Sequence, residues 1–249
     1  MRRTLGFIRQ FGIDPLKTLQ ALRGISRFVV GIGRYLVKSK FEKISVSPVL
    51  IDFYDTAGLA TGHYFWQDLL CAKWIYEEDP DKHFDVGSRV DGFIAHLLSF
   101  REVTLLDIRA LESNIPGLNI IKGDAQVGFP EITSKFESVS SLHSIEHFGL
   151  GRYGDSIDPV GHVKGLVNIA SLVENGGHLY ISFPIGESKV EFNAQRIIKP
   201  EFPFEYLSDF TLEDFVLIPW KGSPKFGLDP RALTELSWGH AGLYKFKKK

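Results

Sequence analysis

The densest group of residues that could do chemistry is the run HSIEHFGLGRYGDSIDP, from His143 to Pro159. It places two histidines, a glutamate, two aspartates, an arginine and a tyrosine among three glycines. Histidine and carboxylate side chains are the groups that most often remove a proton from a reacting molecule. Polar loops held by a rigid scaffold are common places for such work. We therefore predict a functional site in this run, with His143, Glu146 and His147 as its catalytic residues.

The spacing of the two histidines allows other interpretations. His143 and His147 are four residues apart, so they share one face if this segment is helical. That spacing permits a two-histidine metal site completed by Asp155 or Asp158. No third ligand has a defined spacing, and we predict no metal. The histidines and Asp155 could instead hydrogen-bond a tight glycine loop.

Side chains suited to holding a substrate lie in and after the same run. Arg152, Tyr153 and Asp155 belong to it, and the later run EFNAQRI adds Asn193 and Arg196. Amide and guanidinium groups can grip sugar hydroxyls, a carboxylate or a phosphate. For Asn193 and Arg196 the alternative is a salt bridge or a loop anchor. We predict that all five bind the substrate.

The sequence around this run alternates between strand and helix patterns. Apolar residues at helical spacing predict a helix over residues 63–76. Short apolar stretches predict five strands, in HFDVGS, EVTLLDIR, LNIIKGDA, FESVSSLHSI and HLYISFPIG. Helical patterns follow in GFIAHLLSF and in DPVGHVKGLVNIASLVENGG, which two glycines end. The pattern predicts a mostly parallel sheet with helices on both faces, closed near the C-terminus by two strands that include an antiparallel one.

Acidic and small residues follow the predicted strands, at the sheet edge where ligands bind. Asp85 and Gly87 follow the first strand, Asp107 the second and Asp124 the third. An acid about 20 residues beyond the first glycine turn, as Asp107 is, can accept hydrogen bonds from both ribose hydroxyls of a nucleotide cofactor. Gly87 lets the backbone approach the ligand, and Asp124 can accept from the exocyclic amine of adenine. The predicted cofactor site also includes Ser88, Ile108, Ala125 and Ser141.

The order DVGS, LLDIR, KGDA, SLHSIEHF and NGGHLYISFP resembles the class I methyltransferase fold, which binds S-adenosylmethionine. The resemblance covers residues 82–184 and predicts a Rossmann-like α/β fold. The run LHSIEHFGLGRYGDSIDP with EFNAQRI is similar to an uncharacterised bacterial branch, a domain-of-unknown-function family often linked with surface-polysaccharide genes. By this resemblance Asp85 and Gly87 flank the amino acid part of the cofactor, Asp107 holds its ribose, and Asp124 and Ala125 hold its adenine.

The loop after the first strand departs from the superfamily pattern. That loop usually reads acid-x-glycine-x-glycine-x-glycine, whereas here it is DVGSRVDGF. Arg89 and Asp91 occupy the places of the second and third glycines, and Gly92 comes one residue late. These charged side chains could narrow the pocket, the loop could take another path, or Arg89 could pair with the carboxylate of the cofactor.

The N-terminal part of the chain differs in charge from the rest. The 249 residues carry a net charge of -1, yet ten basic residues lie in positions 1–43 against Asp14 and Glu42 alone. The stretch ISRFVVGIGRYLV is too short and too charged to span a bilayer. It could lie on a membrane surface or pack on the main domain. We predict a basic helical extension over residues 1–53 and one Rossmann-like domain over residues 54–249.

These features together predict a methyltransferase-like protein that uses S-adenosylmethionine on a small-molecule or glycan acceptor, in surface-polysaccharide synthesis. Methyl transfer to a hydroxyl needs a base, and His143 or Glu146 is placed to act as one. One alternative is a non-catalytic binding or scaffold protein that has lost the cofactor, and another is a nucleotide-sugar-dependent transferase. We expect a cytoplasmic protein, at the inner membrane face if its N-terminal helices contact lipid or a partner protein. No nucleic-acid partner is expected, and the oligomeric state stays open.

Overall fold

The computed structural model describes residues 9–40, 43–56, 58, 60–109, 114–234, 236 and 239–249. The chain divides into two units, residues 1–59 and residues 60–249, and each is described by itself. No helix in the described part of the chain is both long and apolar enough to cross a membrane.

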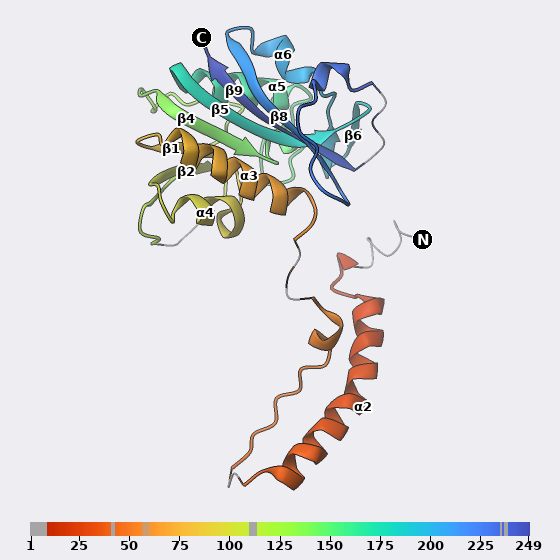
Figure 1. The fold of residues 1–249 in the computed structure, drawn as a ribbon. Coiled ribbons are helices and arrows are strands. Elements are labelled where there is room, and N and C mark those ends of the chain that lie inside the picture. The colour runs from red at the N-terminus through yellow and green to blue at the C-terminus, as the bar shows by residue number, and fades with distance from the viewer. Residues whose placement is uncertain are drawn as a thin grey trace. The chain divides into compact units, whose positions relative to one another are not determined.

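The first unit is built on one helix, α2 (Pro15–Lys38), and a segment that returns along it and contains only a short 3-10 turn, Asp52–Tyr54 (Figure 1). The carboxylate of Asp14 caps the helix by accepting hydrogen bonds from the backbone N–H groups of Leu16 and Lys17. A Cβ on Gly24 would lie 2.1 Å from the carbonyl oxygen of Leu50. Glycine at this position therefore lets the returning segment pack closely, where the sequence had suggested further helix.

The second unit contains a seven-stranded sheet in the order β3-β2-β1-β4-β5-β9-β8 (Figure 1). Its strands are β1 (His83–Val86), β2 (Val103–Asp107), β3 (Leu118–Lys122), β4 (Phe136–Leu142), β5 (Val173–Ile185), β8 (Phe210–Pro219) and β9 (His240–Lys248). Strands β1 to β5 pair in parallel, and β9 pairs antiparallel with both β5 and β8. This Rossmann-like α/β sheet confirms the predicted mostly parallel sheet with its antiparallel closing strand.

Helices cover both faces of the sheet, as the near-continuous apolar strands predicted. The helices α3 (His63–Glu78) and α4 (Ala95–Leu97) pack on one face, and α5 (Gly161–Ser171) packs on the other, with α6 (Phe202–Tyr206) beside it. Successive strand residues point to opposite faces. Leu105 therefore joins the core beneath α3, while Leu106 joins the core beneath α5.

One local prediction was wrong, and a second gave the right place for a helix but not its type or length. The helix expected to end at Gly176 and Gly177 already ends at Ser171, and β5 starts before these glycines. A Cβ on Gly177 would lie 2.8 Å from the carbonyl oxygen of Glu137, so this glycine permits close packing beside β4. The helix expected over residues 92–100 is a π-helical turn (Val90–Ile94) followed by the single turn of α4. A short hairpin of β6 (Lys189–Glu191) and β7 (Gln195–Ile197) was not predicted.

The order of the strands creates a crevice at one edge of the sheet. From β1 the chain adds β2 and β3 on one side, and β4 and β5 on the other. Open α/β sheets bind ligands at such a reversal, beyond the carboxyl ends of the strands. Strand β1 ends at Val86 and β4 at Leu142, so Gly87 and His143 begin the two loops that border this crevice.

Candidate functional site

A pocket of about 230 Å³ lies at this edge of the sheet. The predicted site residues that line it are Gly87, Asp107, Ile108, Asp124, Ala125, His143, His147, Tyr153 and Asp155. The other predicted residues lie outside the lining: Asp85, Ser88, Ser141, Glu146, Arg152, Asn193 and Arg196. The residues brought together come from the ends of β1 to β4 and from the run after β4.

Asp107 is the last residue of β2 and lines the pocket. Its carboxylate accepts three hydrogen bonds from Arg109: the backbone N–H at 2.7 Å, Nε at 3.0 Å and Nη2 at 2.8 Å. The guanidinium of Arg109 is about half exposed and also lies over the ring of Tyr153, 4.5 Å from its centroid. An acid thus stands at the position predicted for a ribose-binding group, with an arginine folded over it.

Asp124 and Ala125 follow β3 and form the next part of the wall. The carboxylate of Asp124 accepts from the backbone N–H of Gln126 at 2.9 Å. The carbonyl of Ala125 accepts from the side-chain amide of Asn168 on α5 at 2.8 Å. The apolar side chains of Leu106, Ile108 and Phe148 also line the pocket. An acid beside an apolar slot suits a flat heteroaromatic ring with an exocyclic amine.

Gly87 shapes the floor of the pocket between β1 and the run after β4. Its φ is +74°, in the left-handed region that favours glycine. A Cβ at this position would lie 2.2 Å from Oγ of Ser144. The loop after β1 and the loop after β4 therefore touch here, and any side chain on Gly87 would push them apart.

The charged residues that replace the expected glycines stay at the outside of the loop. Arg89 donates from Nε and Nη2 to the carboxylate of Asp91, at 3.1 and 2.8 Å, and both side chains are mostly exposed. The guanidinium of Arg89 lines the pocket and lies 5.4 Å from the ring centroid of Tyr64. This pair occupies the rim and leaves the floor at Gly87 open.

The late glycine of the loop has a structural explanation. A π-helical turn contains one more residue per hydrogen bond than an α-helical turn, so the turn Val90–Ile94 absorbs one extra residue. Gly92 lies in this turn, and a Cβ on it would be 2.6 Å from Oδ2 of Asp68 on α3. Gly92 therefore lets the loop after β1 pack closely against α3. It lies one residue later than the third glycine of the superfamily loop.

Asp85, Ser88 and Ser141 form a buried layer beneath the pocket. Asp85 accepts from the backbone N–H and the hydroxyl of Ser88, at 2.9 and 2.7 Å, and from the hydroxyl of Ser140. The hydroxyl of Ser88 in turn accepts from the N–H of Leu142, and that of Ser141 donates to the Val86 carbonyl. These side chains hold the ends of β1 and β4 together, and none of the three belongs to the lining of the pocket.

A buried histidine extends this layer away from the pocket. His83 contacts Oγ of Ser138 through Nδ1 and Oγ of Ser140 through Nε2, both at 2.7 Å. The hydroxyl of Ser140 donates to Asp85, so it must accept from Nε2–H of His83, and Ser138 then donates to Nδ1. Burial lowers the pKa of His83 to about 3 and raises that of Asp85 to about 7. His83 is therefore a neutral, structural residue.

His143 and Glu146 form a buried pair on the opposite wall. Nδ1 of His143 lies 2.7 Å from Oε1 of Glu146, and the side chains are 5% and 1% exposed. Burial alone would raise the pKa of Glu146, but His143 and His147 outweigh it and hold that pKa below its usual value. A carboxylate only accepts, so Nδ1 of His143 carries the proton. Nε2 of His143 and Oε2 of Glu146 are buried without a hydrogen-bond partner among the described residues.

The backbone and the neighbours of His143 fix the position of its ring. Its φ of +48° lies in the left-handed region, a strained conformation for a residue other than glycine. The ring of His63 stacks on it with centroids 5.4 Å apart and planes 5° apart, and the ring of Tyr64 lies 5.1 Å away. Both rings come from the first turn of α3, which thereby orients the histidine that follows β4.

His147 has a defined tautomer as well. Its Nδ1 lies 2.8 Å from the carbonyl oxygen of Ala194, and Nη1 of Arg152 donates to the same oxygen at 2.9 Å. Because the carbonyl only accepts, Nδ1 carries a proton and Nε2 of the neutral ring keeps its lone pair. Burial lowers the pKa of His147, although the charge of Glu146 acts in the opposite sense. His147 is thus neutral near pH 7 and anchored to the β6–β7 hairpin.

Asp155 and Arg196 hold the backbone of the polar run that follows β4. The carboxylate of Asp155 accepts from the backbone N–H groups of Gly149, Gly151 and Tyr153, at 2.8, 3.1 and 3.2 Å. The buried guanidinium of Arg196 donates to four carbonyl oxygens. These acceptors belong to Glu146, Phe148, Asp158 and Pro159. Both side chains form these hydrogen bonds with the backbone of the loop. For Arg196, the role of a loop anchor therefore fits better than contact with a substrate.

Asn193 and Arg152 lie on the surface near this loop. Asn193 is exposed in the turn of the β6–β7 hairpin, outside the pocket lining. The exposed guanidinium of Arg152 lies 5.1 Å from the ring centroid of Tyr153, which lines the pocket. Arg152 therefore stands at the rim, one side chain away from the pocket.

Tyr64, Arg109 and Ser144 line the pocket although they were not predicted. A charged residue two positions after a strand-end acid, as Arg109 is, could have been recognised as its partner. Tyr64 gave no local signal, because α3 is brought to this edge by the packing of the sheet. The position of Ser144 under Gly87 depends on a contact between loops 57 residues apart in the sequence.

A metal centre at the two histidines is not favoured by the geometry. Nδ1 of His147 and the carboxylate of Asp155 are already engaged by the backbone. In the described part of the chain, three side chains that could gather around a metal are Glu78, His178 and Glu213. The ammonium of Lys245 pairs there with Glu78 and lies 3.4 Å from Oε2 of Glu213. A protein cation thus balances that acidic cluster.

Residues 106–201 match the family model described as "Caenorhabditis protein of unknown function, DUF268". That description names no activity, and it mentions neither bacteria nor polysaccharide. Among curated proteins, no sequence is significantly similar to this chain.

The solved structures with a similar arrangement include proteins that are named as methyltransferases. The N-methyltransferase NodS of Bradyrhizobium japonicum, with bound S-adenosyl-L-homocysteine, is 11% identical and has a TM-score of 0.48, over 75% of this chain and 88% of its own. An S-adenosylmethionine-dependent methyltransferase of Clostridium acetobutylicum is 11% identical, with a TM-score of 0.49, over 90% and 99%. A putative methyltransferase of Bacillus halodurans is 15% identical, with a TM-score of 0.49, over 73% and 98%.

Proposed function

We propose that this protein is an S-adenosylmethionine-dependent methyltransferase that acts on a hydroxyl group of a small or glycan acceptor. One observation carries the proposal: the strand-end acids Asp107 and Asp124 line the same pocket as His143, and Glu146, outside the lining, forms a buried pair with His143. The acids are suited to a nucleoside, and the pair is suited to removing a proton. A surface-polysaccharide role rests on the sequence resemblance.

The residues present fit the nucleoside part of this cofactor. A carboxylate has about four acceptor positions, and Arg109 occupies three of those on Asp107. Two of the three come from an exposed guanidinium, which can swing away to admit a ribose diol. Asp124 and the apolar slot beside it suit adenine. The open floor at Gly87 leaves room for the rest of the cofactor, and Arg89 at the rim offers a partner for its carboxylate.

S-adenosylmethionine, when bound, supplies an electrophilic methyl group on a positively charged sulfur. The chain itself must then hold an acceptor hydroxyl and remove its proton. Nε2 of His143 is unpartnered among the described residues, and in the neutral ring it accepts that proton. Glu146 fixes the ring through Nδ1 and stabilises the imidazolium that forms, as a carboxylate does for a catalytic histidine elsewhere.

His147 and Tyr153 extend the acceptor side of the pocket. The ring of Tyr153 packs edge-on against His147, with centroids 5.5 Å apart, and two guanidinium groups lie near it. An aromatic ring beside neutral hydrogen-bonding groups suits a sugar, whose hydroxyls need partners and whose C–H face packs on aromatic carbon. Arg152 at the rim adds a charge for a carboxylate or phosphate on such an acceptor.

Calorimetric titration with S-adenosylhomocysteine and S-adenosylmethionine tests the proposal directly. We expect both to bind with a dissociation constant well below 1 mM. His143→Ala should leave their affinity within about threefold, because this residue lies on the acceptor side. Absence of binding by the folded protein at millimolar cofactor would refute the methyltransferase function and favour the scaffold alternative. Tighter binding of a nucleotide sugar than of either cofactor form would favour the transferase alternative.

The chain offers a matched control for the ribose acid. Asp229 and Arg231 repeat the contacts of Asp107 and Arg109, with backbone, Nε and Nη2 hydrogen bonds of 2.9, 3.0 and 3.0 Å, but lie outside the pocket. Asp107→Ala removes hydrogen bonds to a charged acceptor and should weaken binding by at least about 30-fold. Asp229→Ala should leave it unchanged. Equal effects of the two substitutions would count against a nucleoside contact at Asp107.

A further inference from the structure

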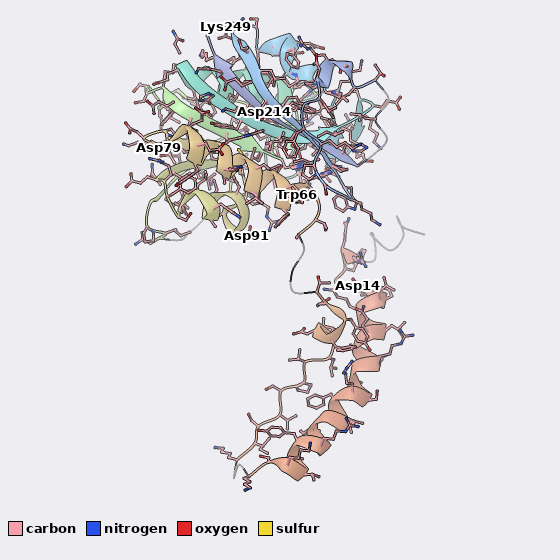
Figure 2. The ribbon with its side chains drawn as sticks, in the orientation of Figure 1. Asp14, Trp66, Asp79, Asp91, Asp214 and Lys249 are labelled. Atoms are coloured by element: carbon pink, nitrogen blue, oxygen red, sulfur yellow. The ribbon has the colours of Figure 1, made fainter. Side chains whose placement is uncertain are left out.

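The first unit has a charge pattern that the proposed reaction does not use. Helix α2 carries five basic side chains and no acidic one between Pro15 and Lys38. Its acidic cap, Asp14, precedes the helix (Figure 2). The carboxylate of Asp14 pairs with the guanidinium of Arg9. An isolated helix with this composition presents an uncompensated positive charge along its length.

The returning segment covers only one side of α2. Gly24 contacts Leu50, and a groove between the helix and residues 43–47 is lined on the helix by Phe28, Gly31, Ile32 and Tyr35. At 100° per residue these helix positions fall within one arc of about 100°. The guanidinium of Arg27 lies over the ring of Phe53 at the edge of that arc. Within this unit, most of the circumference of the helix is therefore uncovered.

An apolar face lies on the uncovered side. Leu22, Val29 and Leu36 are 60%, 58% and 52% exposed and follow one another every seven residues. The same face continues through further exposed apolar side chains, Leu19, Ile25, Val30 and Val37. Together they span an arc of about 140°. A face of this width is broader than the two-position seam of a coiled coil and is typical of a helix that buries one of its sides.

Basic residues border this apolar face. Arg23 and Arg34 lie at its edge on the helical wheel, with Arg27 and Lys38 beyond them. Long basic side chains at such positions can extend from a buried backbone to anionic groups at the surface of a bilayer. Each basic residue near an anionic membrane strengthens binding about fivefold.

The charge also distinguishes a membrane from a second copy of the helix. Two helices that pair through an apolar seam usually place opposite charges beside it. Here α2 offers only positive charges, so two copies would repel each other. An anionic lipid surface neutralises the same charges.

We propose that α2 binds in the plane of an anionic lipid bilayer, with Leu22, Val29 and Leu36 among the acyl chains and its arginines at the headgroups. This places the enzyme or binding domain at a membrane surface and does not depend on the methyltransferase function. It implies that removal of lipid charge and removal of the apolar face each abolish binding.

Co-sedimentation of the full chain with vesicles tests the proposal. The vesicles are phosphatidylcholine alone and phosphatidylcholine with about 30% phosphatidylglycerol, at about 0.1 M and 0.5 M salt. We expect binding to the anionic vesicles only, weakened at the higher salt because exposed charges are then screened. Equal binding to both vesicle types, or no binding to either, would overturn the proposal.

Substitutions separate the contributions of charge and apolar surface. Arg23→Gln with Arg34→Gln should weaken binding about 25-fold, and Leu22→Glu with Val29→Glu should abolish it. The control carries the same charge change at exposed lysines of the second unit, Lys221→Gln with Lys225→Gln, and should bind as the wild type does.

Circular dichroism and light scattering complete the experiment. Unchanged helix content shows that each variant remains folded. A wild-type dimer that becomes monomeric in the Leu22→Glu, Val29→Glu variant, without any vesicle binding by the wild type, would show a protein contact and overturn the membrane assignment. Loss of binding in the lysine control would show a contact through the second unit and overturn it as well.

Discussion

Gly87 links the two loops of the pocket, and its replacement by alanine should be unusually costly. The backbone at this position has a φ of +74°, and a left-handed conformation costs a residue with a Cβ about 1–2 kcal/mol. The new Cβ would also lie 2.2 Å from Oγ of Ser144 and 3.3 Å from its Cβ. Forcing apart a packed contact of this kind costs about 1–3 kcal/mol. Reduced freedom of the unfolded chain returns up to about 1 kcal/mol.

The net expectation for Gly87→Ala is a loss of about 2–4 kcal/mol in the free energy of unfolding, measured by urea denaturation. Gly154→Ala is the matched control, because its φ is +90° and a Cβ there would have no heavy atom of the described residues within 4 Å beyond its chain neighbours. It should lose only about 1 kcal/mol. The difference between the two variants measures the contact with Ser144.

A double substitution isolates that contact. In a Ser144→Ala background the nearest oxygen is gone, so Gly87→Ala should cost little more than Gly154→Ala. Gly87→Ala should also weaken binding of S-adenosylhomocysteine, because Gly87 forms the floor of the pocket. The reasoning would be refuted by an unfolding cost of Gly87→Ala that is the same with and without the Ser144 hydroxyl. A cost no larger than that of Gly154→Ala would refute it too.

Three further substitutions test the site. Arg109→Gln frees the carboxylate of Asp107 from a half-exposed ion pair. In calorimetry the variant should bind S-adenosylhomocysteine up to about fivefold more tightly. A lower affinity would show that Arg109 itself binds the cofactor. Glu146→Gln places an amide where Oε2 has no partner among the described residues. The variant should lose about 1–3 kcal/mol in the free energy of unfolding, measured by urea denaturation. An unchanged free energy of unfolding would contradict the buried geometry. Burial raises the pKa of Asp85 to about 7. The folded state therefore holds the proton of this carboxyl group more tightly than the unfolded state does. The stability that this proton contributes falls as the pH rises from about 4 to about 7. The stability of the wild type relative to Asp85→Asn should therefore decrease by up to about 4 kcal/mol between pH 4 and pH 8, and a constant difference would refute the assignment.

The sheet was predictable because its signals are local. Each buried parallel strand is a short apolar run, and the acid or glycine at its end lies at a fixed place in that run. Asp107 and Asp124 were found in this way, and both line the pocket. The end of α5 was misplaced because Gly176 and Gly177 look like a helix stop, whereas Gly177 makes room for a neighbouring carbonyl group.

The roles within the polar run could not be assigned from its composition. Histidine and glutamate were recognised as candidate bases, but their pairing depends on the left-handed backbone of His143 and on burial of Glu146. Arg196 was predicted to contact substrate, yet it donates to four carbonyl groups of the loop. Whether a polar side chain serves a loop or a ligand depends on which backbone groups the fold leaves without partners.

The sequence by itself determined the succession of strands along the chain, the acids at their ends and the polar run after β4, because apolar periodicity and strand-end residues are encoded locally. Only the tertiary structure decided which of these groups share a pocket. It placed Tyr64 of α3 against His143, closed Gly87 onto Ser144, and put Asp85 beneath the floor. These contacts join segments far apart in the chain, and they exist only after the sheet has formed and excluded water from its edge.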